Sequence, residues 1–183
     1  MRRTFSAAAL AVVLVLLVAA CGSSDDGSDT SATATWADGV CSSVTTWTNA
    51  LTASVDSLKG GNVSREALEG AVDDVKSATD TFVDDLKGLG KPDTEAGEEA
   101  KDSVDQLTDQ LEQEVDKIES AADDVSGVSG VLTAISTVTA TLASMGSQLS
   151  STFSELEQLD ASGELEDAFR ESDSCQGITG GSG

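Results

Sequence analysis

Adjacent carboxylates are the most conspicuous reactive groups in this sequence. Aspartate pairs occur at Asp73–Asp74, Asp84–Asp85 and Asp123–Asp124, and the first two pairs are eleven residues apart. Carboxylate oxygens suit hard cations such as Ca²⁺, which takes about six to eight oxygen ligands. Carboxylates on one rigid helix rarely converge on a single ion, and the spacing of an EF-hand loop is absent. We therefore interpret the pairs as solvated helix faces and expect no metal site.

Acid–base and nucleophilic catalysis are the other chemistries to consider. Acid–base catalysis needs a pocket that raises the pKa of one carboxyl group, and adjacent acids are expected by chance among 33 acidic residues. The chain has no histidine to activate a serine and no Gly-x-Ser-x-Gly turn. The glycine-rich segment 127–130 lacks the lysine of a phosphate-binding loop. We expect no catalytic residue, no cofactor and no enzymatic activity.

The first twenty residues have the features of an export signal. Arg2 and Arg3 precede an apolar run from Ala7 to Ala20 that ends in small residues, which is the arrangement of a secretory signal peptide. A membrane-spanning helix needs about 20 apolar residues, whereas this run is shorter and no basic residue follows it closely. Residues 2–5 also resemble the start of a twin-arginine signal, so the export route stays open.

The end of this signal resembles the lipobox of bacterial lipoproteins. Val18, Ala19, Ala20 and Cys21 each match a position of that motif. The resemblance implies that the signal is cut before Cys21 and that the Cys21 thiol receives a diacylglycerol. Acyl chains such as palmitate would then anchor the mature chain to the outer face of the cell membrane. The chain is similar in this respect to small cell-envelope lipoproteins of actinobacteria, a resemblance that implies no active site.

The charge of the chain limits its partners. Removal of the signal would leave 8 basic against 33 acidic residues, a net charge of −25. Nucleic acids and anionic lipid headgroups would repel such a body. We therefore expect no nucleic-acid partner, contact with the membrane through the lipid anchor alone, and an unidentified envelope protein or component as the binding partner.

Two cysteines remain after Cys21 is assigned to lipid. A pair of cysteines in an exported protein usually forms a disulfide, and the separation of 134 positions between Cys41 and Cys175 fits no metal-binding motif. We predict a disulfide that closes nearly the whole domain; two unpaired thiols are the alternative.

Apolar residues recur at steps of three and four along most of the chain, the period of amphipathic helices. The steps predict four long helices, over about residues 36–58, 64–86, 94–125 and 131–159. A short fifth helix is expected around Leu165–Phe169. The segment Val131–Leu142 is rich in β-branched residues that favour strands, but the surrounding period favours a helix.

Four long helices joined by short turns fit an all-α fold, namely an antiparallel up-down four-helix bundle with a short fifth C-terminal helix. In this topology Cys41 and Cys175 lie at the same end of the molecule. A long helical hairpin or an oligomeric coiled coil is the alternative. The predicted divisions are a signal peptide at 1–20, a lipidated N-terminus and disordered tether at 21–35, the bundle at 36–176 and a disordered tail at 177–183.

These observations predict a membrane-anchored lipoprotein that serves as a non-catalytic binding or structural module. The alternative is a carrier that holds an apolar small molecule between its helices. A carrier would have an internal cavity, lined by residues such as Val104, Leu107, Leu142 and Met145. A binding module would be solidly packed and would expose an apolar patch.

Overall fold

The computed structural model describes residues 26–59, 64–123 and 125–179, and all regular structure in them is helical. Six helices follow one another: α1 (Asp26–Lys59), α2 (Arg65–Leu89), α3 (Gly97–Asp123), α4 (Gly127–Leu159), α5 (Glu164–Glu171) and α6 (Asp173–Thr179). No strand occurs among these residues. The prediction of an all-α protein is confirmed, including a helix across the β-branched segment Val131–Leu142. The predicted signal peptide and Cys21 lie outside the described residues.

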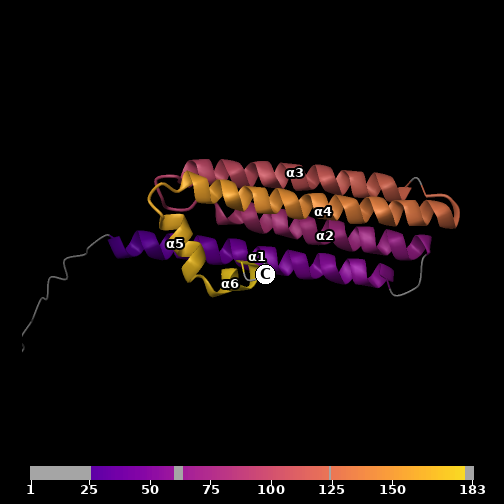
Figure 1. Ribbon diagram of the computed structural model, residues 1–183, viewed down its shortest axis with the longest axis horizontal. Coiled ribbons are helices and arrows are strands. Elements are labelled where there is room, and N and C mark those ends of the chain that lie inside the picture. The colour runs from indigo at the N-terminus through magenta and orange to yellow at the C-terminus, as the bar shows by residue number, and fades with distance from the viewer. Residues whose placement is uncertain (1–25, 60–63, 124, 180–183) are drawn as a thin grey trace, which may run out of the picture.

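The four long helices lie side by side along one axis, and α5 and α6 pack as a short pair against α1 (Figure 1). Each long helix packs mainly on the next one in the sequence: α1 on α2, α2 on α3, and α3 on α4. Helices α1 and α4 touch at few points. The seam between α1 and α4 is therefore less closed than the seams between consecutive long helices.

A single apolar core runs along the long helices, because each contributes a stripe at steps of three and four. Its centre includes Phe82, Leu111, Ile118 and Met145, each at most 1% exposed. Trp47 stacks on Phe82 with ring centroids 4.8 Å apart. The Trp47 Nε1 donates to Thr79 Oγ1 at 3.1 Å, so the polar atom of this buried indole is paired.

Local hydrogen bonds and glycine conformations mark the ends of several helices. Ser64 has an extended backbone, and its Oγ accepts a hydrogen bond from the Ala67 amide at 3.1 Å, which caps α2. Helix α2 ends before Gly90, whose φ of +67° favours glycine, and Gly163 precedes α5 with φ +81°. Helix α3 begins at Gly97, a few residues after its predicted start, because the Gly97 amide donates to the Thr94 carbonyl in a turn.

The predicted tether over residues 21–35 is wrong for residues 26–35, which form the first turns of α1. The side chains near the end of this stretch pack on the connection between α2 and α3. Thr33 is 2% exposed, and its Oγ1 donates to the Asp93 carbonyl at 3.4 Å. One turn later, Trp36 Nε1 donates to the Gly90 carbonyl at 3.1 Å. Small and polar side chains are thus buried here by tertiary contacts that composition does not reveal.

The predicted single short helix at the C-terminus is also corrected. The segment forms two helices, α5 and α6, which are separated at Ser172. The Ser172 amide still donates to the Ala168 carbonyl, but its backbone is extended and ends α5. Residues 177–179 of the predicted disordered tail belong to α6, and the rest of that tail lies outside the described residues. The chain turns here because α6 is bonded to α1.

Candidate functional site

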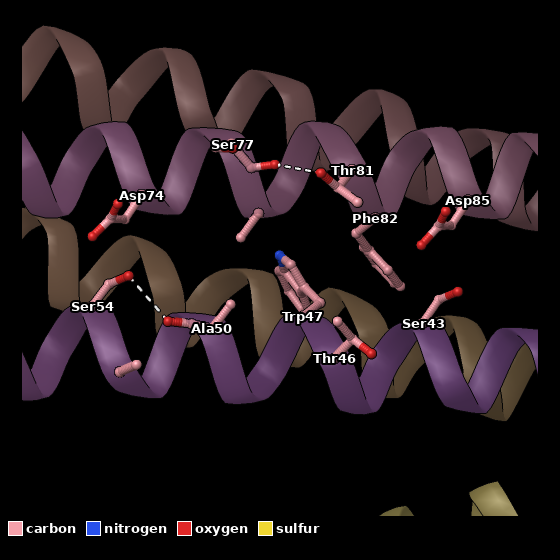
Figure 2. Close-up of a pocket in the computed structure, with 12 residues that line it drawn as sticks. Ser43, Thr46, Trp47, Ala50, Ser54, Asp74, Ser77, Thr81, Phe82 and Asp85 are labelled. Carbon is pink, nitrogen blue, oxygen red and sulfur yellow. Dashed lines mark hydrogen bonds between the residues drawn. The ribbon is translucent and has the colours of Figure 1, made fainter.

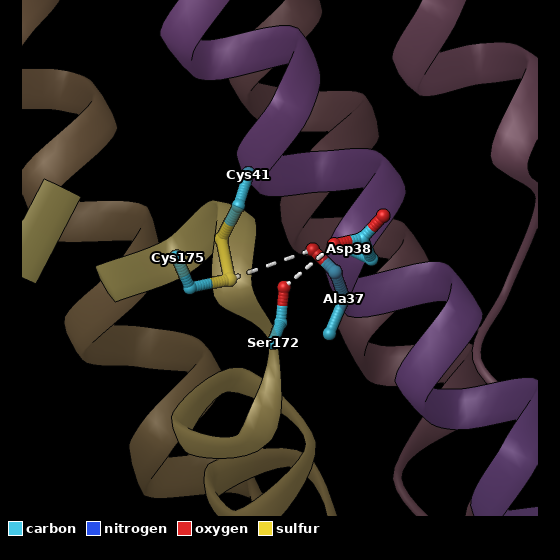
Figure 3. The surroundings of a disulfide bond; sticks show 5 residues. All are labelled: Ala37, Asp38, Cys41, Ser172 and Cys175. Carbon is cyan, nitrogen blue, oxygen red and sulfur yellow. Dashed lines mark hydrogen bonds between the residues drawn. A yellow bond between two sulfur atoms is a disulfide. The ribbon is translucent and has the colours of Figure 1, made fainter. Parts of the chain in front are cut away.

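The disulfide between Cys41 and Cys175 joins α1 to α6 (Figure 3). The two Cα atoms are 5.0 Å apart, and neither residue is more than 2% exposed. The predicted bond is confirmed. Ser172 Oγ donates to Asp38 Oδ1 at 2.9 Å beside it (Figure 3). Hydrogen bonds from Ser174 and then Ser172 hold the pKa of the Asp38 carboxyl below its ordinary value.

A pocket of about 530 Å³ opens next to this disulfide, where α1, α4, α5 and α6 meet. Its apolar lining includes Phe153 and Phe169, whose rings meet edge to face with centroids 5.6 Å apart. Arg170 also lines the pocket, but it is ion-paired with Glu166 and Asp167. The lining is therefore largely apolar, and its one basic side chain is already paired.

A shallower groove of about 460 Å³ runs between α1 and α2 (Figure 2). Its walls are small side chains, and Asp74 and Asp85 of α2 stand at its edge (Figure 2). The hydroxyl groups of Ser54 and Thr81 donate to carbonyls of their own helices, at 3.0 and 2.9 Å. Trp47 at the base is only 2% exposed. The groove thus combines apolar and polar lining, and the hydroxyl groups of Ser54 and Thr81 are already bonded within their helices.

The aspartate pairs lie on exposed helix surface. Asp73, Asp74, Asp84, Asp85 and Asp123 are all exposed, and Asp124 lies outside the described residues. Within the described part of the chain, no three His, Cys, Asp or Glu residues are grouped so as to hold a metal ion.

One buried carboxylate escaped the sequence analysis. Glu114 on α3 is 7% exposed, and its Oε1 accepts hydrogen bonds from Lys117 Nζ at 3.0 Å, Gln148 Nε2 at 3.0 Å and Ser144 Oγ at 3.4 Å. The last two residues belong to α4, so this network ties the two helices together. A signal was present: Glu114 follows Leu111 by three residues and precedes Ile118 by four, which places it on the apolar stripe.

Charge is distributed unevenly between the helices. Helices α2 and α3 together carry 17 of the 33 acidic residues. In contrast, no Asp, Glu, Lys or Arg occurs from Gly39 to Val55 on α1, nor in the 30 residues from Val125 to Ser154 that include most of α4. The open α1–α4 seam lies between these two uncharged stretches.

A groove of about 320 Å³ follows this seam, lined by side chains such as Leu51 and Val55 of α1 and Leu142 and Leu149 of α4. On α4, Val128 and Leu132 are 69% and 54% exposed, the large apolar side chains most exposed in the described chain. We call the surface along this seam the neutral face. It comprises Thr48, Leu51, Thr52 and Val55 of α1 with Val128, Leu132, Ile135, Leu142, Ala143 and Gly146 of α4, and Asp56 borders it on α1.

The four residues proposed to line a carrier cavity are not brought together around a cavity. Val104, Leu107 and Met145 belong to the packed core and are 5% exposed or less. Leu142 is half-buried and lines the α1–α4 groove instead.

Helix α4 is the one helix of the described chain that is long and apolar enough to cross a membrane. Length and composition alone do not separate a membrane span from the core helix of a bundle. Here α4 packs along α3 and contributes Val138, Met145 and Leu156 to the core.

Comparison with known proteins gives no family assignment. No protein-family model matches this sequence, and searches of curated proteins and of solved structures found no match.

Proposed function

We propose that this chain is a lipoprotein of the cell envelope that acts as a non-catalytic binding or structural module. In this proposal residues 1–20 direct export, and lipid on Cys21 anchors the protein to the outer face of the cell membrane. The complete run Val18-Ala19-Ala20-Cys21 supports the anchor. The short connections between consecutive helices support an antiparallel up-down arrangement of α1 to α4.

The neutral face is the observation that carries the binding role. Soluble proteins rarely expose contiguous apolar side chains unless a partner covers them. Val128 and Leu132 are one helical turn apart and largely exposed. The α4 residues that line the α1–α4 groove, Leu142, Gly146 and Leu149, follow further along the same helix. The acidic surface of α2 and α3 would keep the body soluble and would repel anionic partners.

A carrier of an apolar small molecule is the second candidate, and the pocket beside the disulfide favours it. Its volume of about 530 Å³ lies in the usual range for ligand sites, about 300 to 1,000 Å³. Phe153 and Phe169 would contact an apolar ligand there.

Metabolic labelling with an alkyne fatty acid tests the anchor. The wild-type chain should take up label, Cys21→Ala should lose it, and Ser23→Ala, a change two residues away, should keep it. Label that persists in Cys21→Ala would contradict lipidation at this residue. Stable anchoring by acyl chains also predicts that the labelled protein partitions into detergent.

Native mass spectrometry of the purified protein separates the two functions. A binding module should show the mass of the protein and its anchor alone. One apolar molecule per chain that is lost in Phe153→Ser, but kept in Leu132→Ser, would favour the carrier.

A further inference from the structure

The pocket beside the Cys41–Cys175 disulfide combines aromatic rings with carboxylates. Phe153 and Glu157 of α4 both line it, and so do Glu166 and Phe169 of α5. Residues three or four positions apart lie on the same side of a helix. Each of these two helices therefore presents one phenyl ring and one carboxylate to the same space.

The two phenyl rings stand at a steep angle to each other. Their planes are inclined by 73°, and both side chains are only half-buried, so part of each ring is free to contact a ligand. Phe169 also meets Trp36 edge to face, with ring centroids 5.9 Å apart, which holds the Phe169 ring in place. The face of an aromatic ring attracts a cation that lies within about 6 Å of its centroid.

The hydrogen-bond donors of the lining are already engaged within the chain. Arg170 is paired with Glu166 and Asp167. The Ser150 Oγ and the Gln176 Nε2 donate to oxygen atoms of their own helices, at 3.1 and 3.3 Å. Carboxylate and phosphate ligands are held by charged or backbone donors. The lining therefore disfavours an anionic ligand.

Acceptor oxygens, in contrast, are free. Glu157 is exposed, and within the described chain its carboxylate takes part in no hydrogen bond or ion pair. Two carboxylates and one guanidinium line the pocket, so the excess charge there is negative. The net charge of −23 on the whole chain would also raise the concentration of cations near its surface.

The volume of the pocket limits the size of the ligand. A water molecule takes up about 30 Å³ in the liquid, and a non-hydrogen atom of an organic ligand takes up a similar volume. The pocket of about 530 Å³ thus has room for roughly 15 to 18 such atoms.

We propose that this pocket binds an organic cation, an ammonium group on an apolar alkyl or aryl body. The inference rests on the carrier role given above as the second candidate and names its ligand class. The ammonium group would lie between the Glu157 carboxylate and the faces of the two phenyl rings. The apolar body would lie against Phe153, Phe169 and the disulfide, where its burial releases water.

Calorimetric titration with (4-phenylbutyl)trimethylammonium tests the ligand class. The full-length protein is held in phosphatidylcholine nanodiscs, with empty nanodiscs as the blank, and should bind one cation per chain. The uncharged 4-phenylbutanol and the anionic 4-phenylbutanesulfonate, which share the apolar body, should bind at least about tenfold more weakly. Equal affinity for the three compounds would overturn the cation preference and leave the carrier role, whereas binding of none would overturn both. A chain that carries no lipid is titrated in solution in the same way, so failure of the anchor is distinguishable.

Substitutions on α4 test the position of the cation. Glu157→Gln should weaken binding of the ammonium compound about fivefold, because one charge partner is lost. The matched change Glu155→Gln removes the same charge from an exposed residue outside the lining and should change the affinity less than about twofold. Equal losses in the two variants would overturn the proposal, because they would show attraction by the overall charge and not by this site. Glu157→Lys should reverse the preference in favour of the sulfonate, and an unchanged preference would also overturn it.

Discussion

Reduction of the Cys41–Cys175 disulfide should destabilise the whole helical domain and not only α6. The bond closes a loop of 134 residues, for which loop entropy in the unfolded chain corresponds to about 5 kcal/mol. For a domain of this size, each kcal/mol corresponds to about 2 to 4 °C in melting temperature. Reduction should therefore lower the midpoint by about 10 to 20 °C. Circular dichroism at 222 nm, with and without a phosphine reductant, measures this change.

The double variant Cys41→Ala/Cys175→Ala provides the control. Both cysteines are buried, so alanine removes only a sulfur atom from each site, and the variant should melt near the reduced wild type and ignore the reductant. Equal midpoints for oxidised and reduced protein would refute the argument, because they would show that the loop contributes nothing. A fall of similar size in the double variant on adding reductant would show that the reductant acts elsewhere.

Two further predictions concern single side chains. Glu114→Ala should lower the free energy of unfolding in urea by about 2 to 3 kcal/mol, because Gln148 and Ser144 lose a buried acceptor. The control Glu112→Ala, at an exposed ion pair, should lower it by less than about 1 kcal/mol. Equal losses in the two variants would contradict the network. Asp38→Asn should lower the melting temperature at pH 6, and the difference from wild type should shrink as the pH falls below 3.8. The folded pKa of Asp38 lies below its ordinary 3.8, so the stability that the carboxylate adds is present above 3.8 and is lost as the pH falls through the folded pKa. A pH-independent difference from wild type would show that this carboxylate is not the cause.

The helical fold was predictable because the spacing of apolar residues along the sequence indicates it. Steps of three and four placed Leu68, Phe82, Leu111 and Ile118 inside, and all four are at most 1% exposed. In the segment Val131–Leu142, the helical spacing of apolar residues outweighed the preference of β-branched residues for strands, and the segment is helical. The disulfide followed from the number of cysteines, since two remained after Cys21.

The missed features depend on contacts between distant residues. The early start of α1 is accompanied by the bonds of Thr33 and Trp36 to the α2–α3 connection. The break at Ser172 accompanies the bonds of α6 to α1. Composition showed polar and small residues in both places, and such residues are buried only when a specific partner lies opposite. Glu114 belongs to the same class, because its donors come from α4.

Helix α4 shows most clearly where the spacing of apolar residues is not sufficient to predict which side of a helix is buried. Side-chain size favours burial of Ile135, Leu142 and Phe153, yet these three are only half-buried. The structure buries Ala134, Thr141 and Thr152 instead, in line with the large buried residues Val138, Met145 and Leu156. The two sets of residues have the same spacing along the sequence, so the spacing cannot show which set is buried. Packing against α3 fixes the rotation of α4, partly through the bonds from Ser144 and Gln148 to Glu114. With that side tied to α3, the larger apolar residues must face the seam. The carboxylate network that ties α3 to α4 thus also sets which side of α4 faces the seam.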